Sequence, residues 1–366
     1  MIRAPGTLLL MMLAACAHHD AGTGTDIVIS KATGHLAELE RVWSVAELPD
    51  GRVVIPQSRA VLRADLGAGV ADTLGRMGEG PGEYKQPFRV LVLHGGIGMM
   101  DGQLSRLTVW NPDGTVRSTE PLPRYASFGG VLDTVGHAWF EQLPANVSIG
   151  DVNEAGRAKD STAIYRMTLP GPQYDTVAKI FEIGKVTIRF GNGTLRGEGA
   201  TFRPRLYQTP DVWGVMPDGG LWIARGRENR IDRMSPDGKW AIGVPRLFEP
   251  IPVTKADRRK MHSFPGLPSS SVLDTMYEPM AETKGPFAEA VAGPDGEVWT
   301  RLHQAAGYSR ERYAIFPVSG PSTRTASLPL GRILVAVSAR NLYTIHEDDE
   351  GFWELERYER PSPGGA

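Results

Sequence analysis

The sequence predicts an all-β fold assembled from copies of one small unit. The tripeptide Pro-Asp-Gly recurs along the chain, beginning at Pro49, Pro112, Pro217, Pro236 and Pro294. Two copies close the same nine-residue pattern, at 106–114 and 230–238, in which an arginine, an aliphatic residue and a large apolar residue precede the turn. With 43 glycines and 28 prolines in 366 residues, and only 8% aromatic residues, the composition is typical of many short strands joined by turns.

Pro-Asp-Gly suits a tight turn because proline presets φ, aspartate hydrogen-bonds locally and glycine adopts positive φ. Apolar segments typical of strands flank the first, third and fifth copies, at 44–48 and 52–55, 213–216 and 221–224, and 288–292 and 297–300. Weaker strand pairs are predicted at 90–93 and 97–100, 130–132 and 138–140, and 333–337 and 342–345. The same hairpin therefore recurs along most of the chain.

The spacing of these hairpins predicts a six-bladed β-propeller. Their first turns fall near 51, 96, 136, 219, 296 and 341, at separations of 45, 40, 83, 77 and 45 residues. Separations of 40 to 45 match a four-stranded propeller blade, so the two long gaps must hold insertions or, in a seven-bladed alternative, a further blade. The strand at 26–29 is expected to complete the last blade beside 352–358 and so close the ring.

The two long gaps are expected to contain extra elements. In the first gap, 162–169 and 175–180 complete the third blade, and 184–209 form an additional hairpin. The second insertion, at 251–285, begins with Thr254 and Asp257 in a variant of the capping box, which predicts a short helix. The predicted propeller thus spans 26–359 and is followed by a disordered tail at 360–366.

The N-terminal segment predicts export. An apolar run from Leu8 to Leu13 is too short to span a bilayer, so 1–15 is interpreted as a signal peptide. Leu13-Ala14-Ala15-Cys16 resembles a bacterial lipobox, and Cys16 is the only cysteine of the chain. We expect lipidation at Cys16, a lipidated tether at 16–25, and a location in the cell envelope, on the outer membrane or the periplasmic face. The alternative is an ordinary signal peptide with an incidental cysteine.

The charge balance argues against nucleic-acid binding. Lys and Arg total 40 and Asp and Glu total 42, which gives a net charge of −2, whereas a nucleic-acid footprint needs a basic excess. The expected partners are therefore the membrane, reached through the N-terminal lipid, and a small anionic ligand or a protein. The protein is expected to be a monomer.

One decapeptide carries a family resemblance. Gly75-Arg76-Met77-Gly78-Glu79-Gly80-Pro81-Gly82-Glu83-Tyr84, followed by Pro87-Phe88, resembles a segment of bacterial six-bladed β-propeller proteins related to the NHL-repeat group, many of them lipoproteins. The resemblance implies the fold and supplies no catalytic residues. Its glycines predict an inter-blade crossing in which Glu83 accepts backbone donors and Tyr84 packs beneath; a phosphate cradle is the alternative, although the Lys-Ser/Thr of a P-loop is absent.

Propellers bind ligands at the face that carries the loops between second and third strands and the crossings between blades. Pro-Asp-Gly marks the opposite face. Candidate residues after the second strands are Gln57, Arg59, Asp101, Gln103, Arg106, Glu141, Arg230 and His346, and the candidate ligand-binding set is Arg203, Arg205, Arg225, Arg227, Arg301 and His303. Guanidinium groups suit carboxylate, phosphate or sulfate, so this set predicts an anionic ligand. The alternative is that the arginines pair with neighbouring acids.

The main alternative function is a metal-dependent lactonase or esterase. Six-bladed lactonases hold a divalent cation with Glu, Asp and Asn side chains, for which Asp101, Glu141 and Asn229 are candidates here. Serine hydrolysis is less favoured because no Gly-x-Ser-x-Gly occurs, and only His303 and His346 are plausible acid or base groups. We assign no catalytic residue, metal or cofactor. The sequence favours a membrane-anchored binding module over an enzyme.

Overall fold

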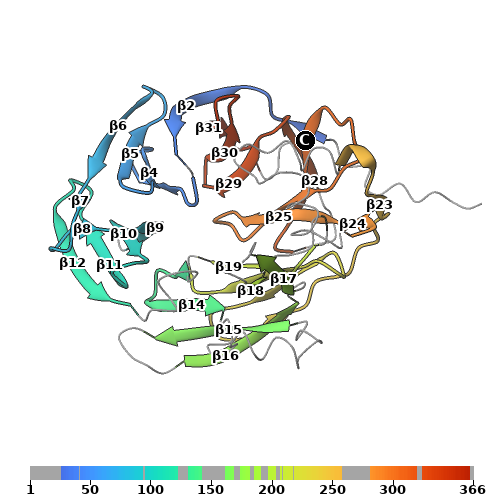
Figure 1. The fold of residues 1–366 in the computed structure, drawn as a ribbon, viewed down its shortest axis with the longest axis horizontal. Helices are drawn as coiled ribbons and strands as arrows, with labels where there is room; N and C mark the ends of the chain where they lie inside the picture. Colours follow the sequence, from blue (N-terminus) through green and yellow to red (C-terminus); the bar gives the residue numbers. More distant parts are fainter. Residues whose placement is uncertain are drawn as a thin grey trace, which may run out of the picture.

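The computed structural model describes residues 26–40, 42–93, 95–122, 131–141, 161–168, 174–181, 185–190, 197–202, 207, 209–216, 218–257, 281–319 and 324–362. Its strands form six small sheets arranged in a ring, the blades of a six-bladed β-propeller (Figure 1). The predicted fold class and blade number are confirmed. Within the described residues, helix is limited to one turn at 255–257.

Each blade has its first strand innermost, and its strands pair in chain order except where N-terminal strands join blades 5 and 6 (Figure 1). Blade 1 contains β3 (Ala46–Glu47), β4 (Val53–Pro56), β5 (Val61–Asp65) and β6 (Val70–Leu74). Blade 2 contains β9 (Pro87–Leu93), β10 (Gly96–Asp101), β11 (Arg106–Trp110) and β12 (Val116–Pro121). Blade 3 contains β13 (Val131–Leu132), β14 (His137–Glu141), β15 (Ser161–Thr168) and β16 (Tyr174–Phe181).

The second half of the ring repeats this pattern. Blade 4 contains β19 (Val212–Val215), β20 (Leu221–Arg225), β21 (Arg230–Met234) and β22 (Trp240–Ala241). Blade 5 contains β25 (Phe287–Ala292), β26 (Val298–Leu302), β27 (Arg310–Phe316) and β28 (Arg324–Pro329). Blade 6 contains β29 (Ile333–Val337), β30 (Asn341–Glu347) and β31 (Trp353–Glu359), and its outer strand comes from the N-terminal part of the chain.

The strand that closes the ring is not the predicted one. β2 (Ala32–Leu39) pairs antiparallel with β31 and completes blade 6, whereas β1 (Asp26–Val28) pairs parallel with β28 as a fifth strand of blade 5. The sequence of β2 contains glycine and two alanines, which have low strand propensity, so its pattern did not indicate a strand. The eight residues of β2 pair along most of β31, which the short segment at 26–29 could not do.

The described residues of the five Pro-Asp-Gly copies lie at one face of the ring. They connect first to second strands in blades 1, 4 and 5, and third to fourth strands in blades 2 and 4. Their glycines have positive φ, from 83° at Gly238 to 93° at Gly114, as the turn requires. In blade 2 the first turn carries positive φ at Gly95 rather than Gly96, which begins β10. We call this side the turn face and the opposite side the crossing face.

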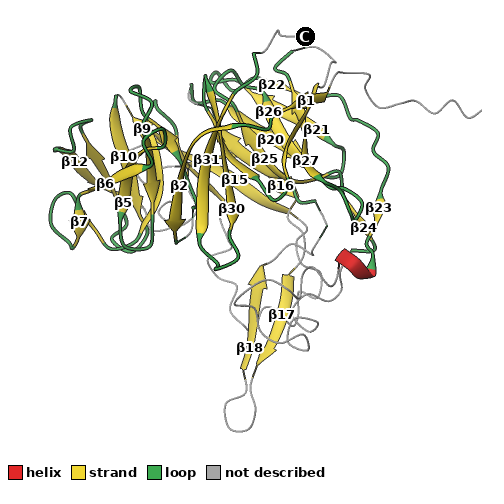
Figure 2. Cartoon of the chain, turned by 90° about the horizontal axis from the view of Figure 1, so that it is seen from above, coloured by secondary structure: helices red, strands yellow, loops and turns green. Residues whose placement is uncertain are grey.

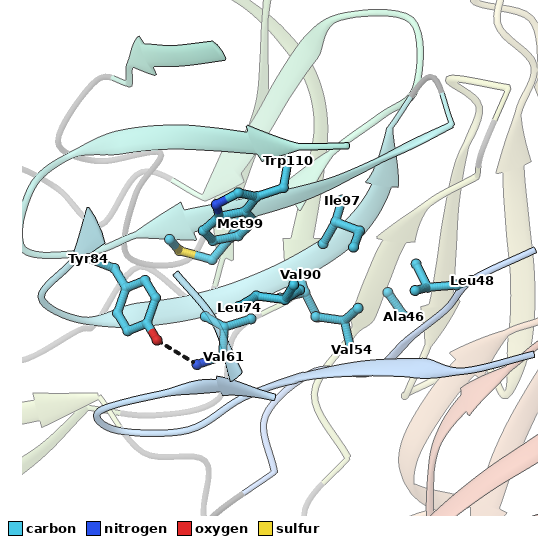
Figure 3. Close-up of a cluster of buried hydrophobic side chains, with 10 residues drawn as sticks. All are labelled: Ala46, Leu48, Val54, Val61, Leu74, Tyr84, Val90, Ile97, Met99 and Trp110. Atoms are coloured by element: carbon cyan, nitrogen blue, oxygen red, sulfur yellow. Dashed lines mark hydrogen bonds between the residues drawn. The ribbon is translucent and has the colours of Figure 1, made fainter. Parts of the chain in front are cut away.

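The decapeptide is the crossing from blade 1 to blade 2, as predicted. β7 (Arg76–Met77) and β8 (Glu83–Tyr84) pair in parallel, and the Gly80 amide donates to Glu83 Oε2 at 2.7 Å. Tyr84 is fully buried, and its hydroxyl accepts a hydrogen bond from the Val61 amide at 3.1 Å (Figure 3). Gly75 and Gly82 have positive φ, and a Cβ on Gly75 would lie 2.5 Å from the Gly82 carbonyl oxygen. The segment therefore acts as a structural crossing.

The core lies between blades, because each blade packs its two faces on its neighbours. One cluster joins blades 1 and 2 through Val54, Val61, Val90, Met99 and Trp110, all at most 4% exposed (Figure 3). Second strands are the most buried, with every residue of β4 and β10 buried, whereas the outer β6 is mostly exposed. This gradient explains why second strands read as continuous apolar runs in the sequence.

Parts of both predicted insertions lie in the described residues. β17 (Lys185–Phe190) and β18 (Gly197–Phe202) form the extra hairpin between blades 3 and 4, which projects from one face of the ring (Figure 2). β23 (Ile251–Pro252) pairs with β24 (Thr283–Lys284), and the helical turn begins after Thr254, whose hydroxyl and amide both bond the Asp257 carboxylate. The basic segment at 258–260 lies outside the described residues.

The ordered framework extends beyond the predicted start of the tail. Arg360 is 7% exposed, and its guanidinium bonds Asp295 and Glu297 at 2.8 Å each. The prediction of a disordered tail from 360 was therefore wrong at its first residue, because a buried ion pair holds this arginine against blade 5. The predicted signal peptide and Cys16 lie outside the described residues.

Candidate ligand-binding site

The crossing face gathers the ends of the second strands, the starts of the third strands and the crossings between blades. The sequence-predicted site residues that the structure describes belong to this face. Arg203 and Arg205 lie outside the described residues. Arg227 is exposed in the loop between β20 and β21.

Arg225 is neutralised by two buried acids. Its Nη1 lies 2.8 Å from Asp211 and its Nε lies 2.8 Å from Asp232, and the side chains of these acids are 3% and 1% exposed. Burial opposes the charge of Arg225, but the hydrogen bonds that Arg225 donates to Asp232 and Asp211 outweigh it and raise the arginine's pKa. Arg230 shares Asp232, with Nε at 2.8 Å. Arg225 and Arg230 therefore hold the loop ends of blade 4 together. Ligand binding by Arg225 stays a prediction, and its ion pairs with Asp211 and Asp232 do not favour it.

Arg301 has a similar environment in blade 5. Its Nη2 lies 3.1 Å from Glu289 and its Nη1 lies 3.6 Å from Glu311, which is almost fully buried. Burial opposes its charge, and Glu289 and Glu311 are among the groups that nevertheless raise its pKa. Glu289 and Glu311 therefore offset the charge of Arg301 at the rim of blade 5.

His303 belongs to a compact polar cluster with Tyr207, Asp257 and Lys284, which we call the blade-5 rim cluster. Lys284 is 3% exposed, and its Nζ donates to Asp257 at 2.6 Å and to the Gln304 carbonyl at 2.7 Å. The same ammonium lies 5.0 Å from the centre of the Tyr207 ring, which meets the His303 ring edge-on at 5.8 Å. The cluster joins the insertion between blades 4 and 5 to the end of β26.

The imidazole of His303 is held neutral. Its Nδ1 lies 2.9 Å from the Gly285 carbonyl, a geometry in which Nδ1 carries the proton and donates. Burial, with smaller contributions from the Arg301 and Lys284 charges, lowers its pKa to about 4. Burial likewise raises the pKa of Tyr207 to about 12. Tyr207 also has a positive φ of 68°, a conformation that costs free energy outside glycine.

Two other predicted rim residues, Arg106 and Gln57, serve the framework, whereas Gln103 is exposed. Arg106 donates to the carbonyls of Glu79, Gly80 and Glu83 at 2.6 to 2.8 Å, and so fastens the decapeptide to blade 2. Gln57 is buried and accepts from the Glu40 amide at 2.8 Å. Arg59 is exposed.

The residues proposed for a divalent cation do not fit such a site. The fully buried Asp101 carboxylate accepts from the amides of Lys85, Gln86 and Leu104 at 2.6 to 3.2 Å. Glu141 accepts from the Trp213 indole, and burial raises the pKa of its carboxyl. Asn229 has a positive φ of 49° and a buried Oδ1 without a partner. Neither Asp101 nor Glu141 belongs to a group of three metal-capable side chains among the described residues.

A different group in the described residues does bring three such donors together. Potential ligand atoms of His346, Glu354 and Glu356 lie within 4.8 Å of one another. His346 Nε2 lies 3.3 Å from Glu354, and its buried Nδ1 has no hydrogen bond. Glu356, however, already accepts two bonds from Arg332, at 3.0 and 3.1 Å, and one from the Tyr358 hydroxyl at 2.7 Å.

Arg89 is the cation that the sequence reasoning missed. It is the third residue of β9, the innermost strand of blade 2, and pairs with Met100 near the crossing face. Among the described residues Arg89 makes no hydrogen bond or ion pair, and its Nε is buried without a partner. Burial alone lowers the pKa of Arg89. In sequence it appears as one charge within a strand, and only the environment distinguishes it from the paired arginines.

No protein-family model and no curated protein sequence matches the chain. Among solved structures it is similar to a candidate exported protein of Bacteroides fragilis, at 12% identity and a TM-score of 0.50, over 92% of this chain and 100% of that chain. It is also similar to the calcium-binding protein regucalcin of Agrobacterium tumefaciens, at 12% identity and a TM-score of 0.43, over 92% and 98% of the two chains. At such identity the first similarity shows the fold and nothing finer.

Proposed function

We propose that this propeller is a binding module for a small anionic ligand and that Arg89 supplies the main charged contact. The observation that carries the proposal is the absence of any counter-charge for Arg89 among the described residues, whereas Arg225 and Arg301 each have two acids. Arg89 is half-buried, and a guanidinium that is partly removed from water without a partner costs free energy. A bound carboxylate or phosphate would supply the missing charge through paired hydrogen bonds.

The position of Arg89 suits this role. Innermost strands face the centre of the ring, and Arg89 lies in the half of β9 nearer the crossing face. On the same side of β9, Leu91 and Leu93 pack against the apolar cluster between blades 2 and 3. An anion there would meet one strong charge in apolar surroundings, where Coulomb attraction is weakly screened.

The test compares wild-type protein with Arg89→Met, which keeps the apolar stem. Without added anion, Arg89→Met should unfold at a higher temperature than wild type, because it removes a half-buried charge whose Nε has no partner among the described residues. With succinate or inorganic phosphate at matched ionic strength, wild type should gain more stability than Arg89→Met. Arg312→Met, which removes an exposed arginine of β27, serves as the matched control. Equal anion-induced stabilisation of wild type and Arg89→Met would contradict the proposal.

We also propose that the module is exported as a monomer and held at the membrane by a lipid on Cys16. β1 runs parallel to β28, so the described chain begins at the turn face. An anchor attached there would leave the crossing face and Arg89 directed away from the membrane. No helix among the described residues is long and apolar enough to cross a bilayer. Cys16→Ser should move the protein from the membrane fraction to the soluble fraction; continued membrane association would refute the anchor.

A metal-dependent hydrolase is the second candidate, favoured by the His346, Glu354 and Glu356 group. These side chains offer the nitrogen and oxygen donors that a divalent cation prefers. Elemental analysis of purified protein, together with lactone and ester turnover, tests this candidate. Metal and turnover that are both lost in Glu354→Gln would support the hydrolase. Metal-free protein without turnover would eliminate it.

A further inference from the structure

A surface pocket of about 480 Å³ lies on the turn face at blade 6, away from Arg89. It is formed by the turn between β29 and β30, the end of β31 and the start of β2. The polar side chains that line it include Thr33, Arg340, Arg357, Glu359, Arg360 and Ser362. Three cations and one acid therefore meet around one hollow.

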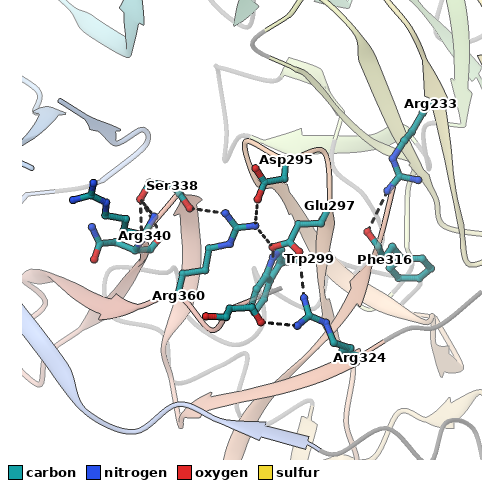
Figure 4. A network of polar contacts seen from close by, with 11 residues as sticks. Arg233, Asp295, Glu297, Trp299, Phe316, Arg324, Ser338, Arg340 and Arg360 are labelled. Carbon is teal, nitrogen blue, oxygen red and sulfur yellow. Dashed lines mark hydrogen bonds and ion pairs between the residues drawn. The ribbon is translucent and has the colours of Figure 1, made fainter. Parts of the chain in front are cut away.

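One of these arginines is a fixed part of the wall. The side chain of Arg360 is 2% exposed and lies between the Ser338 carbonyl and the carboxylates of Asp295 and Glu297 (Figure 4). Its Nε is buried without a hydrogen bond. Asp295 and Glu297 offset the charge of Arg360, so it gives the pocket shape rather than net charge.

The other two arginines are not neutralised. Arg357 donates to the Thr33 hydroxyl and carbonyl, at 3.1 and 3.2 Å, and makes no ion pair within the described residues. Arg340 is exposed, and in the described part of the chain its guanidinium makes neither a hydrogen bond nor an ion pair. In the next turn, Asp65 is already engaged by the amides of Gly67 and Ala68. The Thr33 hydroxyl itself donates to the Arg357 carbonyl at 3.2 Å, so the pocket presents two guanidinium groups beside the Ser362 hydroxyl.

We propose that this pocket binds a phosphate group, held by Arg340 and Arg357 and oriented by the hydroxyl of Ser362. Two guanidinium groups match the several acceptor oxygens of a phosphate better than the single carboxylate plane of a small acid. The phosphate group can belong to a soluble phosphate or to a phospholipid headgroup. The second source fits the location, because β1 begins on the same face and an N-terminal lipid would bring that face to the bilayer.

Calorimetric titration of inorganic phosphate tests the pocket separately from the central site. The full chain carrying Arg89→Met is titrated with and without Arg340→Gln, an exposed substitution that leaves the fold intact. We expect Arg340→Gln and Arg357→Gln each to weaken phosphate binding about tenfold, through loss of a charge-assisted hydrogen bond. Arg312→Gln should leave the affinity unchanged. Affinity unaffected by either pocket substitution, or no binding at all, would overturn the proposal.

Vesicle sedimentation separates the two sources of phosphate. The Cys16→Ser chain, which cannot be acylated, is mixed with phosphatidylcholine vesicles with or without phosphatidylglycerol. Binding to the anionic vesicles that is lost in Arg340→Gln identifies a lipid headgroup as the ligand. Phosphate binding by calorimetry without vesicle binding identifies a soluble phosphate. Absence of both refutes the site, whatever Arg89 does.

Discussion

The hydroxyl of Tyr84 accepts a hydrogen bond from the Val61 amide at 3.1 Å and so ties the crossing segment to the third strand of blade 1. Both groups are fully buried. A related contact joins blades 5 and 6, where the Tyr313 hydroxyl accepts from the Leu334 amide at 2.9 Å. Single tyrosines thus satisfy amides at two blade junctions.

Tyr84→Phe should destabilise the protein by about 1–3 kcal/mol, because it leaves the Val61 amide buried without an acceptor while keeping the ring. Chemical denaturation with an unchanged m-value would measure this loss. Tyr165→Phe is the control, since that hydroxyl makes no hydrogen bond within the described residues. If Tyr84→Phe is no less stable than Tyr165→Phe, the tie contributes nothing.

Arg225→Met should destabilise the protein by roughly 3–5 kcal/mol, because the buried Asp211 would lose this cation and Asp232 would keep only Arg230. The same substitution at Arg89 should stabilise, since no acid depends on it. Thermal and urea unfolding of both variants measure these opposite changes in stability. If both variants were stabilised, or both destabilised, the paired Arg225 and the unpaired Arg89 would contribute to stability in the same way.

Acid should weaken the fold through His303. Its pKa falls from 6.5 to about 4 on folding, so between these values the unfolded state binds a proton that the folded state does not. The free energy of unfolding therefore decreases as the pH is lowered from 6.5 to about 4. Below about pH 4, both states are protonated and His303 causes no further loss of stability. The contribution is on the order of 3 kcal/mol.

His303→Gln removes this titration. Its stability should fall less steeply than that of wild type between pH 6.5 and about 4. Unfolding at a series of pH values makes the comparison, with unchanged behaviour above pH 7 as the internal control. Parallel curves throughout the acid range would mean that His303 is not held neutral.

Turn chemistry made most of the fold predictable. Pro-Asp-Gly requires positive φ at glycine, and the buried second strands produce apolar runs, so blades could be counted from Gly51, Gly136, Gly219 and Gly296. The closing strand β2 was missed because its alternating, low-propensity residues gain strand structure only from pairing with β31. Its stability comes from tertiary context.

The candidate site was less predictable, for a physical reason. An arginine's role depends on whether an acid lies within reach, and Asp211 stands 14 residues from Arg225 in sequence. The sequence shows the charges but not their distances. It therefore selected Arg225 and Arg301, which have partners, and passed over Arg89, which has none among the described residues.

The central claim is that Arg89 needs an external anion. Calorimetric titration of inorganic phosphate into Arg340→Gln/Arg357→Gln protein, with and without Arg89→Met, tests it most directly, because the turn-face pocket is disabled in both. The account predicts phosphate binding that Arg89→Met weakens by about tenfold or more. Equal binding in the two proteins, or none in either, would contradict it.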